Sequence, residues 1–145
     1  MISPSILVTP QQFIAAARAS VGTPFRHEAR LPGVGLDCIG VAVCAAIACG
    51  LVHRDIKAYP LRPNGQLIRE LDAQLVLVAQ RSMEGARPGD ILAMQFEGTP
   101  HHIAIYTGAT IIHAYIAAHK CVEQPMVDYW RSMVQRVYRF REFIG

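Results

Sequence analysis

The sequence predicts an α+β domain, with N-terminal helices packed on one side of a mostly antiparallel sheet of about five to six strands. Up to position 79 the apolar residues recur mainly at helical spacing. After about position 90 they fall in short runs that are rich in β-branched and aromatic residues and are separated by glycine, proline or polar residues. Helical segments followed by strand segments are typical of helices that cover one face of an antiparallel sheet.

The composition supports one globular domain. The chain has 145 residues, of which 52% are hydrophobic and 17% are charged. This is enough apolar material for one core, so we expect a single domain over 1–145 without disordered regions. The net charge of +3 suits an anionic partner, but it is too sparse to predict a nucleic-acid-binding surface.

The first helix is predicted to begin at Thr9, whose hydroxyl can cap the helix, with Pro10 at the first helical position. Its apolar positions have helical spacing: Phe13, Ile14, Ala17 and Val21. Gly22 and Pro24 are expected to end this helix. The segment 26–36 is rich in glycine and proline and is predicted to be a loop.

The second helix is predicted to begin after Asp37 and to end at Gly50. No residue is charged in the 15 positions from Cys38 to Val52. A membrane-spanning helix needs about 18–20 such residues, so a buried core helix is the better interpretation and no membrane partner is expected. The N-terminal segment has neither a basic start nor a long apolar run, so we expect no secretory signal and synthesis in the cytoplasm of a bacterium.

A loop is predicted at 59–65, and a third helix over 65–79. Leucine and valine recur there at helical spacing: Leu67, Leu71, Leu75 and Val78. The strands are then predicted as a meander over 91–96, 102–108, 110–115, 120–124 and 134–140.

Cys38 is the candidate nucleophile. With Asp37 as the N-cap, its thiol would lie in the first turn of the second helix, where the helix dipole is expected to lower the thiol pKa. The backbone N–H of Cys38 could also stabilise an oxyanion. Cys44 and Cys49 are interpreted as small hydrophobic residues of the same helix, and for Cys38 packing remains the alternative.

Neither a metal nor an organic cofactor is expected. The four cysteines include no C-x-x-C pair. Cys38 and Cys49 on one helix would lie about 16 Å apart, so they cannot share a metal ion.

Two histidines are the candidate partners of the thiol. Strand alternation places His102 on one face of its strand, with Ala104 and Tyr106, and His101 on the other face. His113 falls in the next strand, about 4.8 Å away. An imidazole there could orient the ring of His102, as the third group of a nucleophile–base site does. A single histidine in a strand is more often structural than catalytic. The hypothesis of a catalytic site therefore depends on the combination of Cys38 with both histidines.

The order of these motifs resembles the NlpC family of papain-like cell-wall cysteine endopeptidases. The similar segments are 22–25 (GTPF), 35–41 (GLDCIGV), 87–92 (RPGDIL), 101–108 (HHIAIYTG) and 111–115 (IIHAY). Within the family the sequence is most similar to short members encoded in phage tail gene clusters, prophages and gene transfer agents. The resemblance implies a papain-like domain whose nucleophile begins a helix.

The resemblance also implies roles for individual residues. Cys38, His102 and His113 would be catalytic, and an amide bond of the peptidoglycan stem peptide would be hydrolysed. Asp37 would contribute to the oxyanion or substrate site. Many family members have a tyrosine hydroxyl upstream of the cysteine, but Phe25 stands there, so His27 or the backbone alone would have to replace it.

Two alternatives remain open at this stage. The chain could be a non-catalytic tail-assembly component with the same fold, or a thiol amidase or acyltransferase of the same superfamily. A phage-type enzyme would act at the cell wall on a phage-like particle, with tail proteins as further partners. The C-terminal arginines, together with Tyr129 and Trp130, are interpreted as a solvated strand face, with a docking surface as the alternative.

Overall fold

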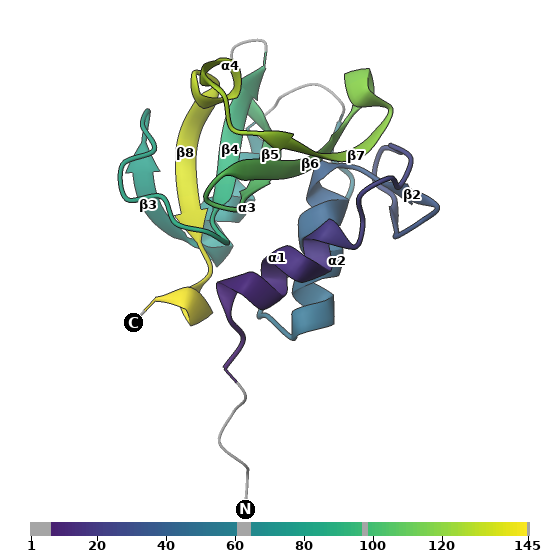
Figure 1. Cartoon of the computed structure of the whole chain (residues 1–145), viewed down its shortest axis with the longest axis horizontal. Helices are drawn as coiled ribbons and strands as arrows, with labels where there is room; N and C mark the ends of the chain where they lie inside the picture. Colours follow the sequence, from purple (N-terminus) through teal and green to yellow (C-terminus); the bar gives the residue numbers. More distant parts are fainter. Residues whose placement is uncertain (1–6, 61–64, 97–98, 145) are drawn as a thin grey trace, which may run out of the picture.

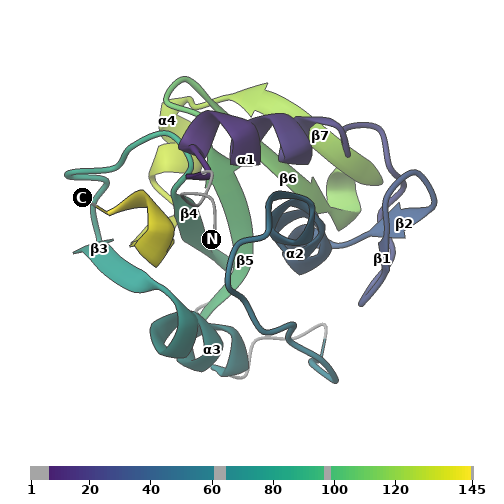
Figure 2. The ribbon, with the colours of Figure 1, turned by 90° about the horizontal axis from the view of Figure 1, so that it is seen from below.

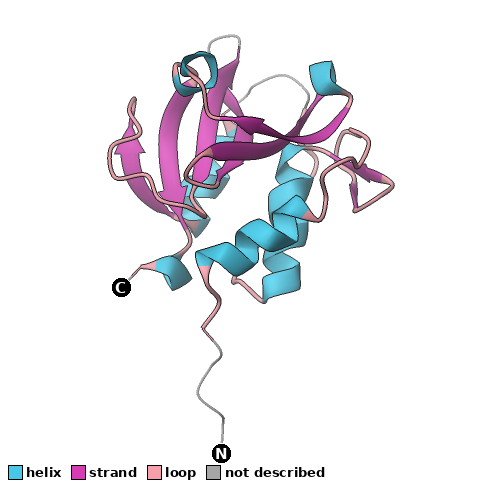
Figure 3. Ribbon diagram, viewed as in Figure 1, coloured by secondary structure: helices cyan, strands magenta, loops and turns pink. Residues whose placement is uncertain are grey.

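The computed structural model describes residues 7–60, 65–96 and 99–144. A six-stranded antiparallel sheet has the order β3-β8-β4-β5-β6-β7. Three helices, α1 to α3, lie on one side of this sheet, in front of the strands in the view from below (Figures 1, 2 and 3). The predicted α+β class and the predicted sheet are therefore confirmed.

The elements have the following bounds. The helices are α1 (Pro10–Arg18), α2 (Cys38–Cys49), α3 (Gln66–Gln74) and α4 (Asp128–Arg131). The strands of the main sheet are β3 (Val76–Gln80), β4 (Ile91–Phe96), β5 (Thr99–Tyr106), β6 (Thr110–Tyr115), β7 (Lys120–Pro125) and β8 (Val134–Arg139). Two short 3-10 turns cover Ile116–Ala118 and Arg141–Phe143. Positions 1–6, part of the segment expected to carry no secretory signal, and 61–64, in the loop predicted at 59–65, lie outside the described residues.

Helix α1 begins as predicted and ends earlier than predicted. The Thr9 hydroxyl accepts the N–H of Gln12, and the Gln12 side chain accepts the N–H of Thr9, which completes a capping box. The helix stops at Arg18 because the chain then turns to run beside β7. There Gly22 donates to the carbonyl of Cys121, and Cys121 donates back to the carbonyl of Thr23.

Helix α2 follows the predicted bounds. Asp37 is its N-cap, and Gly50 ends it in the left-handed region with φ of 72°. Gly40 has to be glycine because a Cβ there would lie 2.5 Å from the carbonyl oxygen of Ala29. This close approach holds the segment 26–36 against the start of α2.

Two predicted elements are corrected. The helix predicted over 65–79 ends at Gln74, because Leu75 is already extended and the β-branched residues after it pair with β8. The loop predicted over 26–36 contains a small hairpin, β1 (Arg30–Leu31) with β2 (Gly35–Leu36).

The sheet separates two apolar clusters. The larger cluster lies between the sheet and the helices and includes Phe13, Val41 and Ile105. The smaller cluster, on the other face, includes Met94 and Val137. Among the described residues, no helix combines the length and the apolar character that a membrane crossing requires.

Candidate active site

Cys38 is the first residue of α2, in contact with β5. The Asp37 carboxylate caps the helix by accepting the N–H of Gly40 at 2.8 Å. The Cys38 sulfur lies within hydrogen-bonding reach of two backbone N–H groups, those of Ile103 in β5 and of Ile39. Ile103 directly follows His102 in the chain, so Cys38 contacts the strand that carries the predicted base.

His102 and His113 form a buried hydrogen-bonded pair between β5 and β6. His102 Nε2 lies 2.8 Å from His113 Nδ1, and the residues are 4% and 0% exposed. The pairing of β5 with β6 covers Ile105 and Tyr106 of β5, so His102 lies beyond the paired stretch. The two rings therefore meet outside the stretch over which β5 is paired with β6. The predicted strand alternation is confirmed, since Ile103 belongs to the larger cluster and Ala104 to the smaller.

Gln124 extends the histidine pair, and the sequence analysis missed it. Its Oε1 lies 2.8 Å from His113 Nε2, and its Nε2 donates to the Tyr115 hydroxyl at 3.5 Å. In the register of β6 with β7, Gln124 faces Ile111, two residues before His113 on the same face. A polar residue at that alternating position of β7 was the available signal, but it needs the β6–β7 register to be interpreted.

Aromatic rings enclose the histidine pair. The ring of His113 lies 4.6 Å from the ring of Tyr115 and 4.9 Å from the ring of Trp130, between centroids. Trp130 belongs to the short helix α4, so the prediction of a solvated strand face is wrong for this residue. It is also wrong for Arg139, whose half-buried side chain pairs with the buried Asp90 at 2.8 Å.

Burial sets the protonation state of the candidate catalytic groups. Burial, with a smaller contribution from the Asp37 carboxylate, raises the pKa of the Cys38 thiol to about 12, and the N–H of Ile103 only partly opposes this. Burial also lowers the pKa of His102 well below 6.5, helped by the neighbouring His113, and lowers the pKa of His113. The expected lowering of the thiol pKa is therefore wrong, because desolvation outweighs the helix N-terminus. The resting site holds a neutral thiol and neutral imidazoles.

This charge state predicts how Cys38 reacts with iodoacetamide. Only the thiolate reacts, and below the thiol pKa its fraction rises about tenfold per pH unit. With a pKa of about 12, the alkylation rate of Cys38 should keep rising from pH 6 to pH 10. Peptide mapping by mass spectrometry measures this rate. In protein unfolded by urea the same thiol, with an ordinary pKa of about 8.5, should level off above pH 9. A plateau below pH 8 in the folded protein would instead show a standing thiolate–imidazolium pair.

Asp37 is part of a buried hydrogen-bond network. The residue is 3% exposed, and its two oxygens accept from four donors. These are the N–H groups of Glu28 and Gly40, both at 2.8 Å, Arg30 Nη1 at 3.0 Å, and the Tyr59 hydroxyl. The Asp37 carboxylate therefore holds the start of α2, and the oxyanion or substrate-binding role expected for it stays a prediction.

The contacts of His27 and Phe25 do not test the roles expected for them. His27 Nε2 lies 2.9 Å from the carbonyl oxygen of Tyr59 and 3.4 Å from the Glu28 carboxylate. These contacts tie the His27 ring to the Tyr59 segment, so a role at the oxyanion stays a prediction. Phe25 is half-buried against the larger cluster and brings no side-chain donor.

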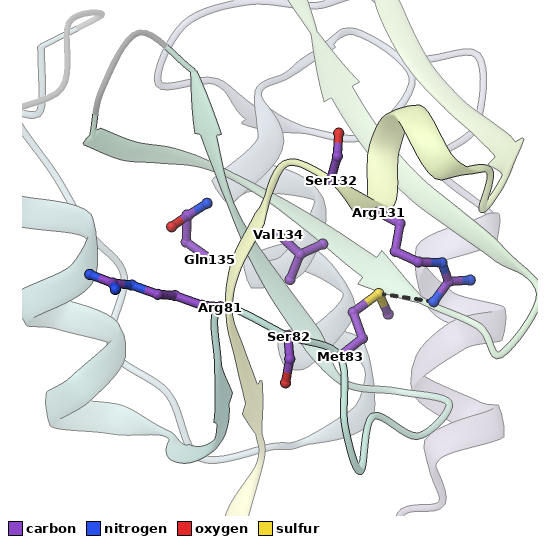
Figure 4. Close-up of a pocket in the computed structure, with 7 residues that line it drawn as sticks. All are labelled: Arg81, Ser82, Met83, Arg131, Ser132, Val134 and Gln135. Atoms are coloured by element: carbon purple, nitrogen blue, oxygen red, sulfur yellow. Dashed lines mark hydrogen bonds between the residues drawn. The ribbon is translucent and has the colours of Figure 1, made fainter.

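A separate open hollow lies away from these residues. It measures about 600 Å³ and is lined by Arg81, Ser82, Met83, Arg131, Ser132, Val134 and Gln135. Figure 4 shows Arg131 directed at Met83, with Nη1 3.5 Å from the sulfur. None of the predicted site residues lines this hollow, so the candidate active site is defined by the Cys38 and histidine contacts.

Solved structures with a similar fold include several NlpC/P60 proteins. The chain superposes on an NLP/P60-family lipoprotein-like protein from Staphylococcus aureus with a TM-score of 0.68 and 18% identity, over 94% of this chain and 42% of that one. It matches NlpC1 from Trichomonas vaginalis with a TM-score of 0.71 and 16% identity, over 90% and 44% of the two chains. It matches the NlpC/p60 domain of the peptidoglycan hydrolase SagA with a TM-score of 0.64 and 22% identity, over 89% and 97%. The chain has the NlpC/P60 fold.

The NlpC/P60 fold agrees with the papain-like arrangement that the motifs implied. The chain spans less than half the length of the staphylococcal and Trichomonas proteins and nearly the whole SagA domain. No family sequence model and no curated protein matches the sequence. At these identities the likeness establishes the fold, and the chemistry has to be argued from the site.

Proposed function

We propose that this chain is a cysteine endopeptidase that hydrolyses an amide bond in the peptidoglycan stem peptide. Two observations carry the proposal: the hydrogen-bonded pair of His102 and His113, and the position of Cys38 at the N-terminus of α2 with its sulfur at the N–H of Ile103, the residue after His102. Its fold neighbours include two proteins described as peptidoglycan hydrolases, SagA and RipB from Mycobacterium tuberculosis. The choice of the stem peptide rests on the resemblance of the motifs around these residues.

In the first half of the proposed reaction, His102 removes the thiol proton as the Cys38 sulfur attacks the amide carbonyl carbon. The pKa values favour neutral groups before the attack, so proton transfer accompanies bond formation. The oxyanion receives a hydrogen bond from the backbone N–H of Cys38, which has no partner inside the helix. His102 then gives its proton to the leaving amine, and the C–N bond breaks to leave a thioester on Cys38.

In the second half, water attacks the thioester carbonyl and His102 takes a proton from that water. The C–S bond breaks, the sulfur recovers a proton, and the stem peptide leaves with a new carboxylate. His113 keeps the His102 ring in place through the 2.8 Å hydrogen bond. Burial by Tyr115 and Trp130 limits competing hydrogen bonds from water to the pair.

Digestion of purified sacculi tests the proposal. Wild-type protein should release new amino groups and muropeptides shortened within the stem, while the glycan strands stay uncut. Cys38→Ala should release nothing above background, because no thioester can form. Mass spectrometry of the soluble fragments identifies the bond. New reducing sugar ends would contradict the proposal.

The finer part of the proposal is that the enzyme belongs to the short phage-tail type and reaches the wall on a phage-like particle. It rests on the motif resemblance alone. If sacculi from several hosts yielded no fragments, the non-catalytic tail component would be favoured. If small amides were hydrolysed while sacculi stayed intact, the thiol amidase would be favoured.

A further inference from the structure

We propose that Gln124 is a positioning residue that sets where the protons lie on His102 and His113, and thereby leaves Nδ1 of His102 unprotonated to act on Cys38. This inference deepens the proposed function and rests on it for its catalytic meaning. The proton positions themselves are a property of the folded chain and can be tested without any substrate.

The amide oxygen of Gln124 determines which nitrogen of His113 carries the proton. Oε1 lies 2.8 Å from His113 Nε2, and a carbonyl oxygen can only accept a hydrogen bond. His113 Nε2 must therefore carry the proton. A neutral imidazole has one N–H, so His113 Nδ1 is an acceptor.

The proton position on His113 in turn determines the proton position on His102. Its Nε2 lies 2.8 Å from His113 Nδ1, which has just been shown to accept, so Nε2 of His102 must donate. The single proton of a neutral His102 is used there, and Nδ1 is left as the base. The Gln124 oxygen in β7 thus determines the tautomers of both His113 and His102.

The orientation of the Gln124 amide decides which partner donates in each of these hydrogen bonds. The NH₂ group of Gln124 points to the Tyr115 hydroxyl, with an N–O distance of 3.5 Å. If the amide were reversed, its NH₂ would donate to His113 Nε2, and each ring would have to carry its proton on Nδ1. His102 would then present an N–H on the side that should accept the thiol proton. In the orientation that the structure shows, the Tyr115 hydroxyl accepts from this NH₂ group, and its ring lies 4.6 Å from the His113 ring.

A neutral amide also suits the electrostatics better than a carboxylate would. Both imidazoles are buried and held neutral. The facing groups on the elements packed around His113 are the His102 ring, the Gln124 amide, the Tyr115 hydroxyl and the Trp130 ring. A carboxylate at position 124 would preserve the acceptor but add a negative charge that favours imidazolium.

Two substitutions separate these effects. Gln124→Glu keeps an acceptor-only group, so the tautomers and kcat should be retained. The added negative charge should raise the pKa of the two imidazoles. The acid limb of the pH profile of kcat/KM should therefore move to higher pH. Gln124→Met removes the acceptor at similar volume, so kcat should fall about tenfold with KM unchanged. Gln135→Met in β8 is the matched control and should behave like wild type.

Nitrogen-15 NMR of the histidine rings gives the decisive measurement on protein without substrate. In the wild-type protein, both His102 and His113 should be protonated on Nε2 and unprotonated on Nδ1. In Gln124→Met, both tautomers should be observed. A wild-type His102 protonated on Nδ1 would overturn the inference, and so would Gln124→Met with unchanged tautomers. If the tautomers follow the inference but sacculi remain uncut, the positioning holds and the proposed endopeptidase fails.

Discussion

His102→Ala is expected to lower kcat/KM on sacculi by about 10²–10⁴-fold, the usual worth of a positioned general base. The substitution removes the imidazole of the residue that precedes Ile103, whose N–H reaches the Cys38 sulfur. His101→Ala should cost less than about threefold, because alternation along β5 turns that side chain to the opposite face. The charge of His101 contributes to the lowered pKa of His102.

Initial rates of fragment release, compared at equal concentrations of folded protein, measure both variants. Thermal unfolding has to show that each variant is folded, since His102 is buried. An inactive His101→Ala with an active His102→Ala would mean that the functional strand register differs by one residue. Equal activity of His102→Ala and wild type would remove the general base from the proposed mechanism.

The sequence predicted those features whose signals are local. Asp37 and Gly50 bracket an uncharged segment, and α2 has these bounds. Alternation along β5 separated His102 from His101 without any knowledge of neighbouring strands. The helix over 65–79 failed because leucine spacing and β-branched residues overlap there, and only the pairing of β3 with β8 decides between them.

Contacts between distant segments could not be predicted in the same way. The pKa of Cys38 depends on burial by β5 and not on its place in the helix alone. Gln124 reaches His113 through the register of β7, and Trp130 reaches it from α4. The donors to Asp37 include Tyr59, which lies 22 positions away in a segment with no helix or strand. In each case tertiary packing supplies the partner.

Arg30→Met is expected to reduce the free energy of unfolding by about 3–5 kcal/mol, the range measured when one member of a buried ion pair is removed. Arg30 Nη1 donates to Asp37 at 3.0 Å, and its Nε donates to Asp55 at 3.0 Å. Its side chain is 19% exposed and that of Asp37 is 4% exposed. Methionine keeps the apolar stem but leaves the Asp37 carboxylate buried without its cation.

Urea unfolding at pH 7 measures this loss, and Arg54→Met is the matched control. Arg54 pairs with Glu70 at 2.9 Å, but its side chain is 65% exposed, so its removal should cost less than about 1 kcal/mol. Adding Asp37→Asn to Arg30→Met should recover part of the loss, because it removes the orphaned charge while the amide oxygen can still cap α2. If Arg30→Met and Arg54→Met cost the same, the Asp37 network is screened by solvent. The start of α2 would then be held by the cap and the close approach at Gly40, and Cys38 would owe its position to those two features alone.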